Sequence, residues 1–264
     1  MLRPLLDLLL PVECGGCRVP GPLLCASCEG LLGAPVQVSA LCYEAGPPVY
    51  ALGLYQGRLR AALLAYKERG RRDLAGPLGG ALARGLLRLP LHPESGGAGV
   101  WLVPVPSRRS AAAARGGQHV ELLARRAAAA LAGMGVAAAV APALRVSFGV
   151  RDSVGLAAAA RQANLAGRVL PRRAGRPPAG TPVVLVDDVV TTGATAAACT
   201  ATLLRMGVEI PAIVVLAAAG SHALLSPSVG DANHSVDPAT RELKLWREHP
   251  GRTNVRASAS PRVR

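Results

Sequence analysis

The sequence predicts an α/β fold in which helices flank a parallel sheet, with a small four-cysteine knuckle at the N-terminus. Short apolar runs alternate along the chain with segments whose apolar residues recur every three or four positions. Such an alternation of strands and helices is typical of a parallel sheet that is covered on both faces. The second observation is a set of four cysteines in two closely spaced pairs near the start of the chain.

The 264 residues divide by composition into three regions. Residues 1–50 hold the cysteine knuckle in irregular, Pro-rich chain, and residues 51–220 carry the alternating pattern of the main domain. Residues 221–264 have few apolar anchors and several Ser, Pro and Arg, which predicts a disordered basic tail. This length is sufficient for one or two domains with an ample core.

Apolar spacing places the elements of the main domain in order. Leucines and alanines at helical spacing predict a first helix over 59–66 and a second over 78–89. A strand over Val100–Val105 ends at Pro106, and a further helix is expected over 120–131. The remaining expected elements are a weak strand over 136–141, a strand over Val183–Val186, a helix over 196–203 that Gly207 ends, and a strand over Ile210–Leu216.

The cysteines follow the pattern Cys14-x2-Cys17-x7-Cys25-x2-Cys28. A two-residue gap lets two thiolates of one turn reach the same metal ion, so two such turns predict a tetrahedral structural zinc site. A pair of disulfides in a secreted domain is the alternative reading. Against secretion, the apolar start of the chain is interrupted by Asp7 and lacks a small-residue cleavage site. We expect a short helix over residues 1–12, no membrane span and a cytoplasmic protein.

The chain is strongly basic, with 30 Lys and Arg against 16 Asp and Glu, for a net charge of +14. Such a surface suits polyanions, including nucleic acid and phosphorylated metabolites. A GC-rich coding sequence, which favours Ala, Gly, Pro and Arg, is an equally good source of the bulk charge. One Phe, four Tyr and two Trp leave few rings for the base stacking on which single-strand binders depend.

The chemistry is concentrated in residues 183–196, which read as a buried strand, two acids, a turn and a helix. Ligands of parallel sheets bind at the carboxyl ends of the strands. The start of a helix offers free N–H groups to a phosphate. The two acids would repel a phosphate, so they suit the hydroxyl groups of a diol instead. The segment therefore predicts a site for a ribose 5-phosphate rather than a merely polar loop. Its residues are Asp187, Asp188, Thr191, Thr192, Gly193, Ala194 and Thr195.

Two other phosphate-binding motifs are excluded. The segment lacks the Gly-Lys-Ser/Thr of a Walker A loop, and no Gly-x-Gly-x-x-Gly fingerprint follows the strand.

The segment resembles the signature of type I phosphoribosyltransferases. In that family the paired acids hold the ribose hydroxyls of phosphoribosyl pyrophosphate (PRPP), and the Thr-Thr-Gly-Ala-Thr turn holds the 5′-phosphate. Together with the cysteine knuckle, further runs resemble the ComF family, phosphoribosyltransferase-like proteins linked to natural competence and DNA uptake. These runs are Val103-Pro104-Val105-Pro106, Arg115-Gly116 and Arg161-Gln162-Ala163-Asn164-Leu165.

The resemblance spans residues 11–219, with three departures. A second Cys-x2-Cys pair of the family would begin at Cys42, but Ala45 occupies the partner position, so we expect one zinc site. The family's Arg-Gly-Phe-Asn-Gln run is Arg115-Gly116-Gly117-Gln118-His119 here, and Asp152-Ser153-Val154-Gly155-Leu156 replaces a Gln-x-x-Leu run.

The resemblance implies that a nitrogen nucleophile displaces pyrophosphate from C1 of PRPP. Mg²⁺ would bridge the diol and the pyrophosphate, and Ser107 and Arg108 lie where relatives bind the pyrophosphate. Arg115 and Lys67 are weaker candidates. The five histidines show no metal-ligand spacing and are expected mostly at the surface, without a catalytic role.

Two further functions are open at this point. A non-catalytic module could sense PRPP or a nucleotide while its Arg-rich surface binds single-stranded DNA or other competence proteins. A zinc-ribbon adaptor would leave the acid pair and the threonine turn without a purpose.

Overall fold

In the computed structural model, the described residues are 12–39, 46–91, 99–107, 117–147, 168–178, 181 and 183–219. The helix expected over 1–12 therefore lies outside them except for its last residue. The tail expected at 221–264 lies outside them entirely.

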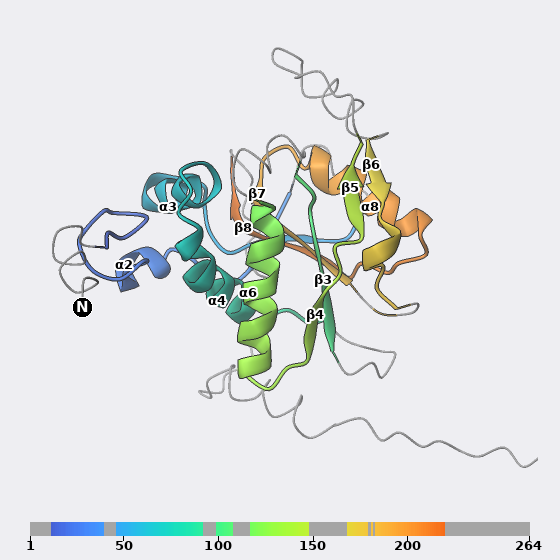
Figure 1. Ribbon diagram of the computed structural model, residues 1–264, viewed down its shortest axis with the longest axis horizontal. Helices are drawn as coiled ribbons and strands as arrows, with labels where there is room; N and C mark the ends of the chain where they lie inside the picture. Colours follow the sequence, from blue (N-terminus) through green and yellow to red (C-terminus); the bar gives the residue numbers. More distant parts are fainter. Residues whose placement is uncertain are drawn as a thin grey trace, which may run out of the picture.

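The helices and strands of these ranges alternate through most of the chain (Figure 1). In chain order they are α2 (Ala26–Glu29), β1 (Val36–Val38), β2 (Val49–Ala51), α3 (Gly57–Glu68), η1 (Arg72–Leu74), α4 (Ala75–Leu86), β3 (Val100–Pro104), α6 (His119–Gly133), β4 (Ala138–Val140), β5 (Leu144–Val146), β6 (Val169–Pro171), η2 (Arg173–Gly175), β7 (Val183–Val190), α8 (Ala194–Arg205) and β8 (Ala212–Ala218).

The central sheet has six strands in the order β1-β2-β8-β7-β3-β4. All neighbours in it run parallel except β1 and β2, which pair antiparallel. The second, two-stranded sheet is the antiparallel pair of β5 and β6. The predicted α/β fold with a mostly parallel sheet is confirmed. Because parallel strands end at one edge, the residues after β3, β7 and β8 meet there.

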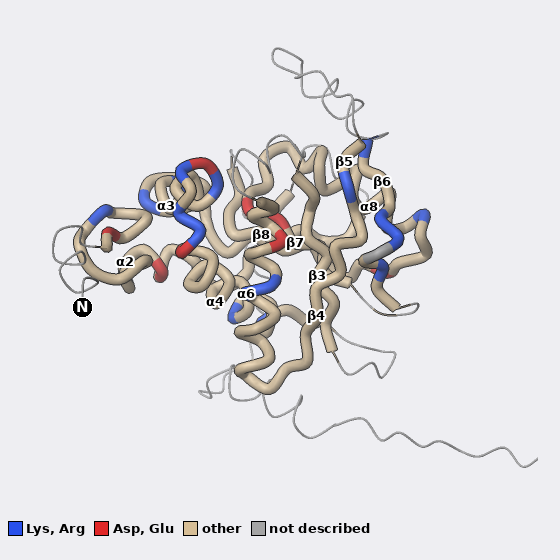
Figure 2. The backbone as a smooth tube through the Cα atoms, viewed as in Figure 1, with Lys and Arg blue, Asp and Glu red and all other residues tan. Residues whose placement is uncertain are grey.

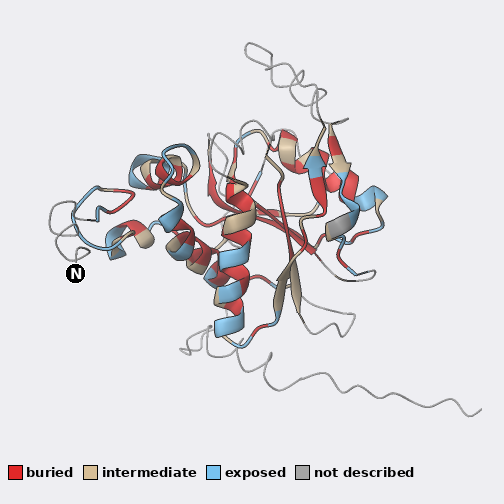
Figure 3. Cartoon of the chain, viewed as in Figure 1, coloured by how far each residue is buried: buried red, intermediate tan, exposed pale blue. Residues whose placement is uncertain are grey.

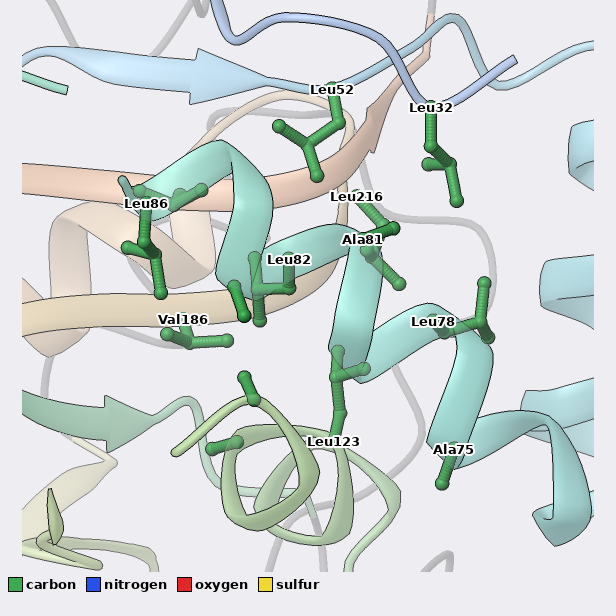
Figure 4. Packing of buried hydrophobic residues seen from close by; sticks show 14 of the residues in the cluster. Leu32, Leu52, Ala75, Leu78, Ala81, Leu82, Leu86, Leu123, Val186 and Leu216 are labelled. Atoms are coloured by element: carbon green, nitrogen blue, oxygen red, sulfur yellow. The ribbon is translucent and has the colours of Figure 1, made fainter. Parts of the chain in front are cut away.

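The sheet is packed on both faces by apolar side chains. Helices α3, α4 and α6 cover one face, where Leu82 and Leu123 pack around Val186 (Figure 4). Helix α8 and the β5–β6 pair cover the other face, in a second cluster that includes Leu185 and Leu203. Strand β8 is buried along its whole length and β7 at six of its eight residues, while α6 alternates between buried and exposed positions (Figure 3). The sheet is therefore the middle of three layers.

Helices α4 and α6 approach each other closely at Gly79. A Cβ atom there would lie 2.6 Å from the Cβ of Arg126 and 3.0 Å from the backbone nitrogen of Ala127. Only a residue without a side chain leaves room for this approach, which holds α6 against the sheet.

Most predicted elements are present, but three parts of the fold differ from the expectation. Strand β7 runs from Val183 to Val190 rather than to Val186, because its pairing with β8 continues past both aspartates to Val190. Strands β1 and β2 form in chain that was expected to be irregular. The predicted boundary between residues 50 and 51 consequently falls inside β2. The β5–β6 pair was not predicted.

Candidate functional site

The predicted sugar-phosphate residues lie together at the carboxyl edge of the sheet. Asp187 and Asp188 lie in the C-terminal half of β7. Residues 191–193 form a bend, and α8 begins at Ala194. Gly193 is the N-cap residue of α8 and has a φ of 79°, a left-handed conformation that favours glycine. The Ala194 N–H lies 3.4 Å from Thr192 Oγ1, to which it donates. This arrangement directs the start of a 12-residue helix toward the sheet edge.

Asp188 is buried, with 3% of its surface exposed, and is held by groups from two helices. Its Oδ2 lies 2.9 Å from His119 Nε2 and 3.1 Å from Lys67 Nζ. Its Oδ1 accepts a hydrogen bond of 2.8 Å from the Val189 N–H. Burial alone would raise the pKa of Asp188, but the hydrogen bond from His119 and the charge of Lys67 outweigh it and hold this pKa well below its usual range. Asp188 is therefore an ionised carboxylate.

Asp187 has a different environment on the other face of β7. Its Oδ1 accepts a 2.8 Å hydrogen bond from the Asp188 N–H. Burial, followed by the negative charge of Asp188, raises the pKa of Asp187 well above its usual range. Burial, and then the charge of Asp187, also raises the pKa of the Cys199 thiol on α8. Because successive strand residues face opposite sides, Asp187 faces α8 and Asp188 faces α6. The two acids thus differ in pKa and in direction.

His119 corrects the expectation that the histidines are surface groups without a role in the site. It begins α6, is 6% exposed and lies between Asp188 and the chain after β3. Its Nδ1 is 3.5 Å from Ser107 Oγ, and its backbone carbonyl accepts a 2.5 Å hydrogen bond from the Tyr66 hydroxyl. The only sequence signal was the departure from the family run at Gln118-His119.

Gln118 fixes the chain after β3 in place. Its side-chain oxygen accepts from the Ser107 N–H at 3.0 Å, and its side-chain nitrogen donates to the Ser107 carbonyl at 3.3 Å. Ser107 therefore presents its hydroxyl to His119 from a backbone that is held on both sides.

A pocket of about 230 Å³ opens beside Ser107. Prolines and the side chains of Leu144 and Val146 supply its apolar wall. Its polar lining includes Ser107, Gln118, Glu121, Arg145 and Arg172. The pocket therefore combines apolar side chains with groups that bind anions and hydrogen-bond donors.

Charge is distributed unevenly around this edge. Figure 2 shows the acidic segment of β7 near the middle of the molecule, with basic positions on α3 and β5 to either side. Lys67 on α3, one of the weaker candidates for the pyrophosphate site, contacts Asp188 directly. Arg108 and Arg115, the other predicted basic residues, lie outside the described residues.

The four N-terminal cysteines form a cluster that can hold a metal ion such as zinc. Their Sγ atoms all lie within 4.8 Å of one another, and those of Cys17 and Cys25 are 3.7 Å apart. Tetrahedral Zn–S bonds of ~2.3 Å give S···S distances of roughly 3.8 Å, so the spacing fits. All four thiols are free.

The backbone of the knuckle is shaped around these sulfur atoms. The Cys25 N–H donates to Cys14 Sγ at 3.4 Å, and a Cβ atom on Gly16 would lie only 2.8 Å from Cys28 Sγ. Burial raises the pKa of the Cys14 thiol, but hydrogen bonds, first that from the Cys25 backbone, lower it to about 6. A thiolate at this position is the form that binds a metal ion.

Comparisons with known proteins find similarity to solved structures at low sequence identity. No protein-family model matches the sequence. No curated protein matches it either. Among solved structures it is similar to adenine phosphoribosyltransferase from Saccharomyces cerevisiae, complexed with an imino-altritol bisphosphate and adenine, at 16% identity and a TM-score of 0.29. That match covers 69% of this chain and 83% of the yeast chain.

A second similar structure is adenine phosphoribosyltransferase from Trypanosoma brucei, in complex with AMP, pyrophosphate and ribose-5-phosphate. The identity is 13% and the TM-score 0.34, over 82% of this chain and 89% of that chain. The ligands in these complexes belong to those two enzymes. Among the helices that the structure describes, none has the length and apolar character needed to cross a bilayer.

Proposed function

We propose that this chain is a ComF-type protein that binds PRPP at the carboxyl edge of β7 and transfers its phosphoribosyl group to an acceptor. The observation that carries the proposal is the order of groups along one edge: two acids in the second half of a buried strand, a Gly193 bend with positive φ, and the start of α8. A sugar diol suits the acids and a phosphate suits the helix start. One ligand that carries both groups is a ribose 5-phosphate.

The pyrophosphate of PRPP requires cationic and hydrogen-bonding groups on the same edge. Lys67 extends toward this edge with 32% of its side chain exposed, and Ser107 ends the adjacent chain after β3. When PRPP binds, Lys67 would exchange its contact with Asp188 for one with the pyrophosphate. We include Arg108, which follows Ser107 in the sequence, in the proposed pyrophosphate site.

The proposal includes Mg²⁺ with PRPP and structural zinc at the cysteine cluster. Asp187 and Asp188 would hold the Mg²⁺, whose preferred ligands are carboxylate and water oxygens. The ion neutralises charge on the leaving pyrophosphate when it is bound. The four thiolates of the knuckle match the ligand set of a closed zinc site, which would hold this short loop in shape.

A thermal-shift experiment tests PRPP binding. PRPP with Mg²⁺ at 100 times its Kd should stabilise the protein by about 2.7 kcal/mol, which raises the Tm by about 5 °C or more. Replacement of both acids, Asp187→Ala with Asp188→Ala, should abolish the rise. Glu209→Ala is the matched control, because it removes an exposed carboxylate beside Val183 at the amino end of β7. An equal rise in the double variant would reject the proposed site.

A second function follows if PRPP binds but pyrophosphate is never released with any acceptor. The net charge of +14 then favours a sensing module that binds single-stranded DNA through phosphate contacts. Its affinity for oligonucleotides should fall steeply with salt and should change when PRPP is added. The resemblance to competence-associated proteins makes DNA uptake the expected setting for either function.

A further inference from the structure

The pocket beside Ser107 shares only this residue with the groups that the proposed function assigns to PRPP. It has a volume of about 230 Å³ and lies between the chain after β3, the start of α6 and the β5–β6 pair. The Val105 N–H donates to the Val186 carbonyl at 2.9 Å, so the chain that forms one wall is the direct neighbour of β7. The volume of this pocket suits a single small molecule.

Two arginines supply positive charge to the pocket. Arg145 lies opposite Leu170 in the pairing of β5 with β6, and Arg172 is two positions beyond Leu170. The Arg172 N–H donates to the Ala143 carbonyl at 2.6 Å, so the pairing continues and alternation places both arginines on one face of the strand pair. Both side chains line the pocket, on the side of the molecule where Figure 2 shows the basic positions of β5. A guanidinium can bind a carboxylate through two parallel hydrogen bonds, so this pair favours a carboxylate ligand.

Glu121 is the one acid among the residues that line the pocket, and its charge is balanced elsewhere. Its Oε1 accepts hydrogen bonds from Arg125, at 2.7 Å from Nη2 and at 3.2 Å from Nε. Gln118 is the N-cap residue of α6, but its side chain bonds to the backbone of Ser107 and not to the helix. The positive end of the α6 dipole therefore lies at the pocket without a side-chain cap. The lining as a whole is positive.

The pocket also presents apolar side chains that are incompletely covered. Pro106, Pro142 and Val146 line it and are only half-buried. An inorganic anion would leave these side chains in contact with water. A ligand with an apolar body would cover them, which is favourable because apolar surface is removed from water.

We infer that this pocket is a binding site for a small carboxylic acid with an apolar body. Arg145 and Arg172 bind the carboxylate, and the apolar body packs against Pro106, Pro142 and Val146. The inference goes beyond the proposed function, because PRPP is a phosphate ester and has no apolar body. Since Ser107 lines the pocket and also belongs to the proposed pyrophosphate site, the two ligands would bind next to each other.

Isothermal titration calorimetry with benzoate, in the absence of PRPP and Mg²⁺, tests the site. Benzoate joins a carboxylate to an apolar ring and should bind with a Kd of about 1 mM or lower. Benzamide has the ring without the charge, and acetate has the charge without the ring, so each should bind at least about tenfold more weakly. Benzoate that does not bind, or that binds no better than benzamide or acetate, would overturn the inference.

Replacement of both arginines, Arg145→Gln with Arg172→Gln, should weaken benzoate binding at least about tenfold. The two residues are exposed, so the thermal unfolding of this variant should match that of wild type. Arg88→Gln with Arg173→Gln is the matched control, because it removes the same charge from two exposed positions outside the lining. Equal losses in the two double variants would show a general attraction to a basic chain and would overturn the site.

Val146→Trp tests the apolar part of the pocket while both arginines remain. The larger side chain should occupy the pocket and weaken benzoate binding at least about tenfold. An unchanged affinity would mean that benzoate binds elsewhere, which would overturn the assignment.

Inorganic pyrophosphate with Mg²⁺ distinguishes this pocket from the proposed pyrophosphate site. Wild type and the Arg145→Gln, Arg172→Gln variant should bind it with the same Kd. A tenfold loss in the variant would assign the two arginines to the pyrophosphate and overturn a separate carboxylate site. Because the benzoate titrations contain no PRPP, their result does not depend on the proposed function.

Discussion

His119 and Asp188 are 69 positions apart in the chain, yet His119 Nε2 lies 2.9 Å from Asp188 Oδ2 inside the protein. This contact joins α6 to the carboxyl end of β7 on the face that α3 also covers. Lys67 completes the group at 3.1 Å from the same oxygen. The contact therefore connects the stability of the fold with the chemistry of the candidate site.

We expect Asp188→Asn to destabilise the protein substantially. The amide cannot balance the charge of Lys67 or accept as strong a hydrogen bond from His119, and because the Lys67 side chain is 32% exposed we expect a loss of about 1–3 kcal/mol. Urea unfolding followed by circular dichroism should show a lower midpoint with an unchanged slope. The control is Asp73→Asn, since Asp73 pairs with Arg71 at 2.9 Å on the surface and the change there should cost under ~1 kcal/mol. Equal losses in the two variants would contradict the assigned ion pair.

Asp187→Asn should have the opposite effect on stability, and the effect should depend on pH. The folded-state pKa of Asp187 is raised, so the folded protein binds its proton more tightly than the unfolded chain does. The resulting penalty is absent below the unfolded pKa of ~3.9, grows as the pH rises toward the folded pKa, and stays constant above it. The variant, which has no such proton, should gain stability over wild type between pH 4 and pH 8. Unfolding free energies measured at both pH values check this, and a difference that does not change with pH would argue against the raised pKa.

Metal analysis of the purified protein should find about one zinc ion per chain, bound by the four thiolates. Removal of zinc with a chelator, or Cys17→Ser, should lower the Tm because the knuckle loses the ion that joins its two turns. Cys199→Ala is the control, since this buried cysteine lies in α8 and outside the cluster. It should retain a full zinc ion. Zinc at full occupancy in Cys17→Ser would show that the ion binds elsewhere.

Gly193→Ala should weaken PRPP binding beyond its effect on stability. Gly193 has a φ of 79° and Gly207, at the other end of α8, has a φ of 70°. Alanine at either position should cost roughly 1–2 kcal/mol of strain, but only position 193 faces the proposed phosphate. Calorimetry should show at least about a tenfold loss of PRPP affinity in Gly193→Ala and none in Gly207→Ala. Equal affinities in the two variants would separate the bend from the phosphate site.

Much of the architecture could be predicted because its signals are local. The leucine and alanine spacing of α3, α4 and α6 records which face of each helix is buried, and the continuous apolar runs of β3, β7 and β8 record burial on both faces. The cysteine spacing and the Asp-Asp to Thr-Thr-Gly segment are equally local, so the metal cluster and the sugar-phosphate candidates were found from short stretches of chain. Alternation along a strand could also have predicted that Asp187 and Asp188 face opposite sides.

Long-range contacts account for what the sequence did not disclose. Strands β1 and β2 have three residues each, too few to show a period, and β2 is held by pairing with β8 at the far end of the chain. Likewise, one histidine among five acquires significance only because the packing of α6 on the sheet brings it to Asp188 and Ser107. Neighbouring residues reveal which groups are buried, whereas the partner of a buried charge depends on how distant elements pack together.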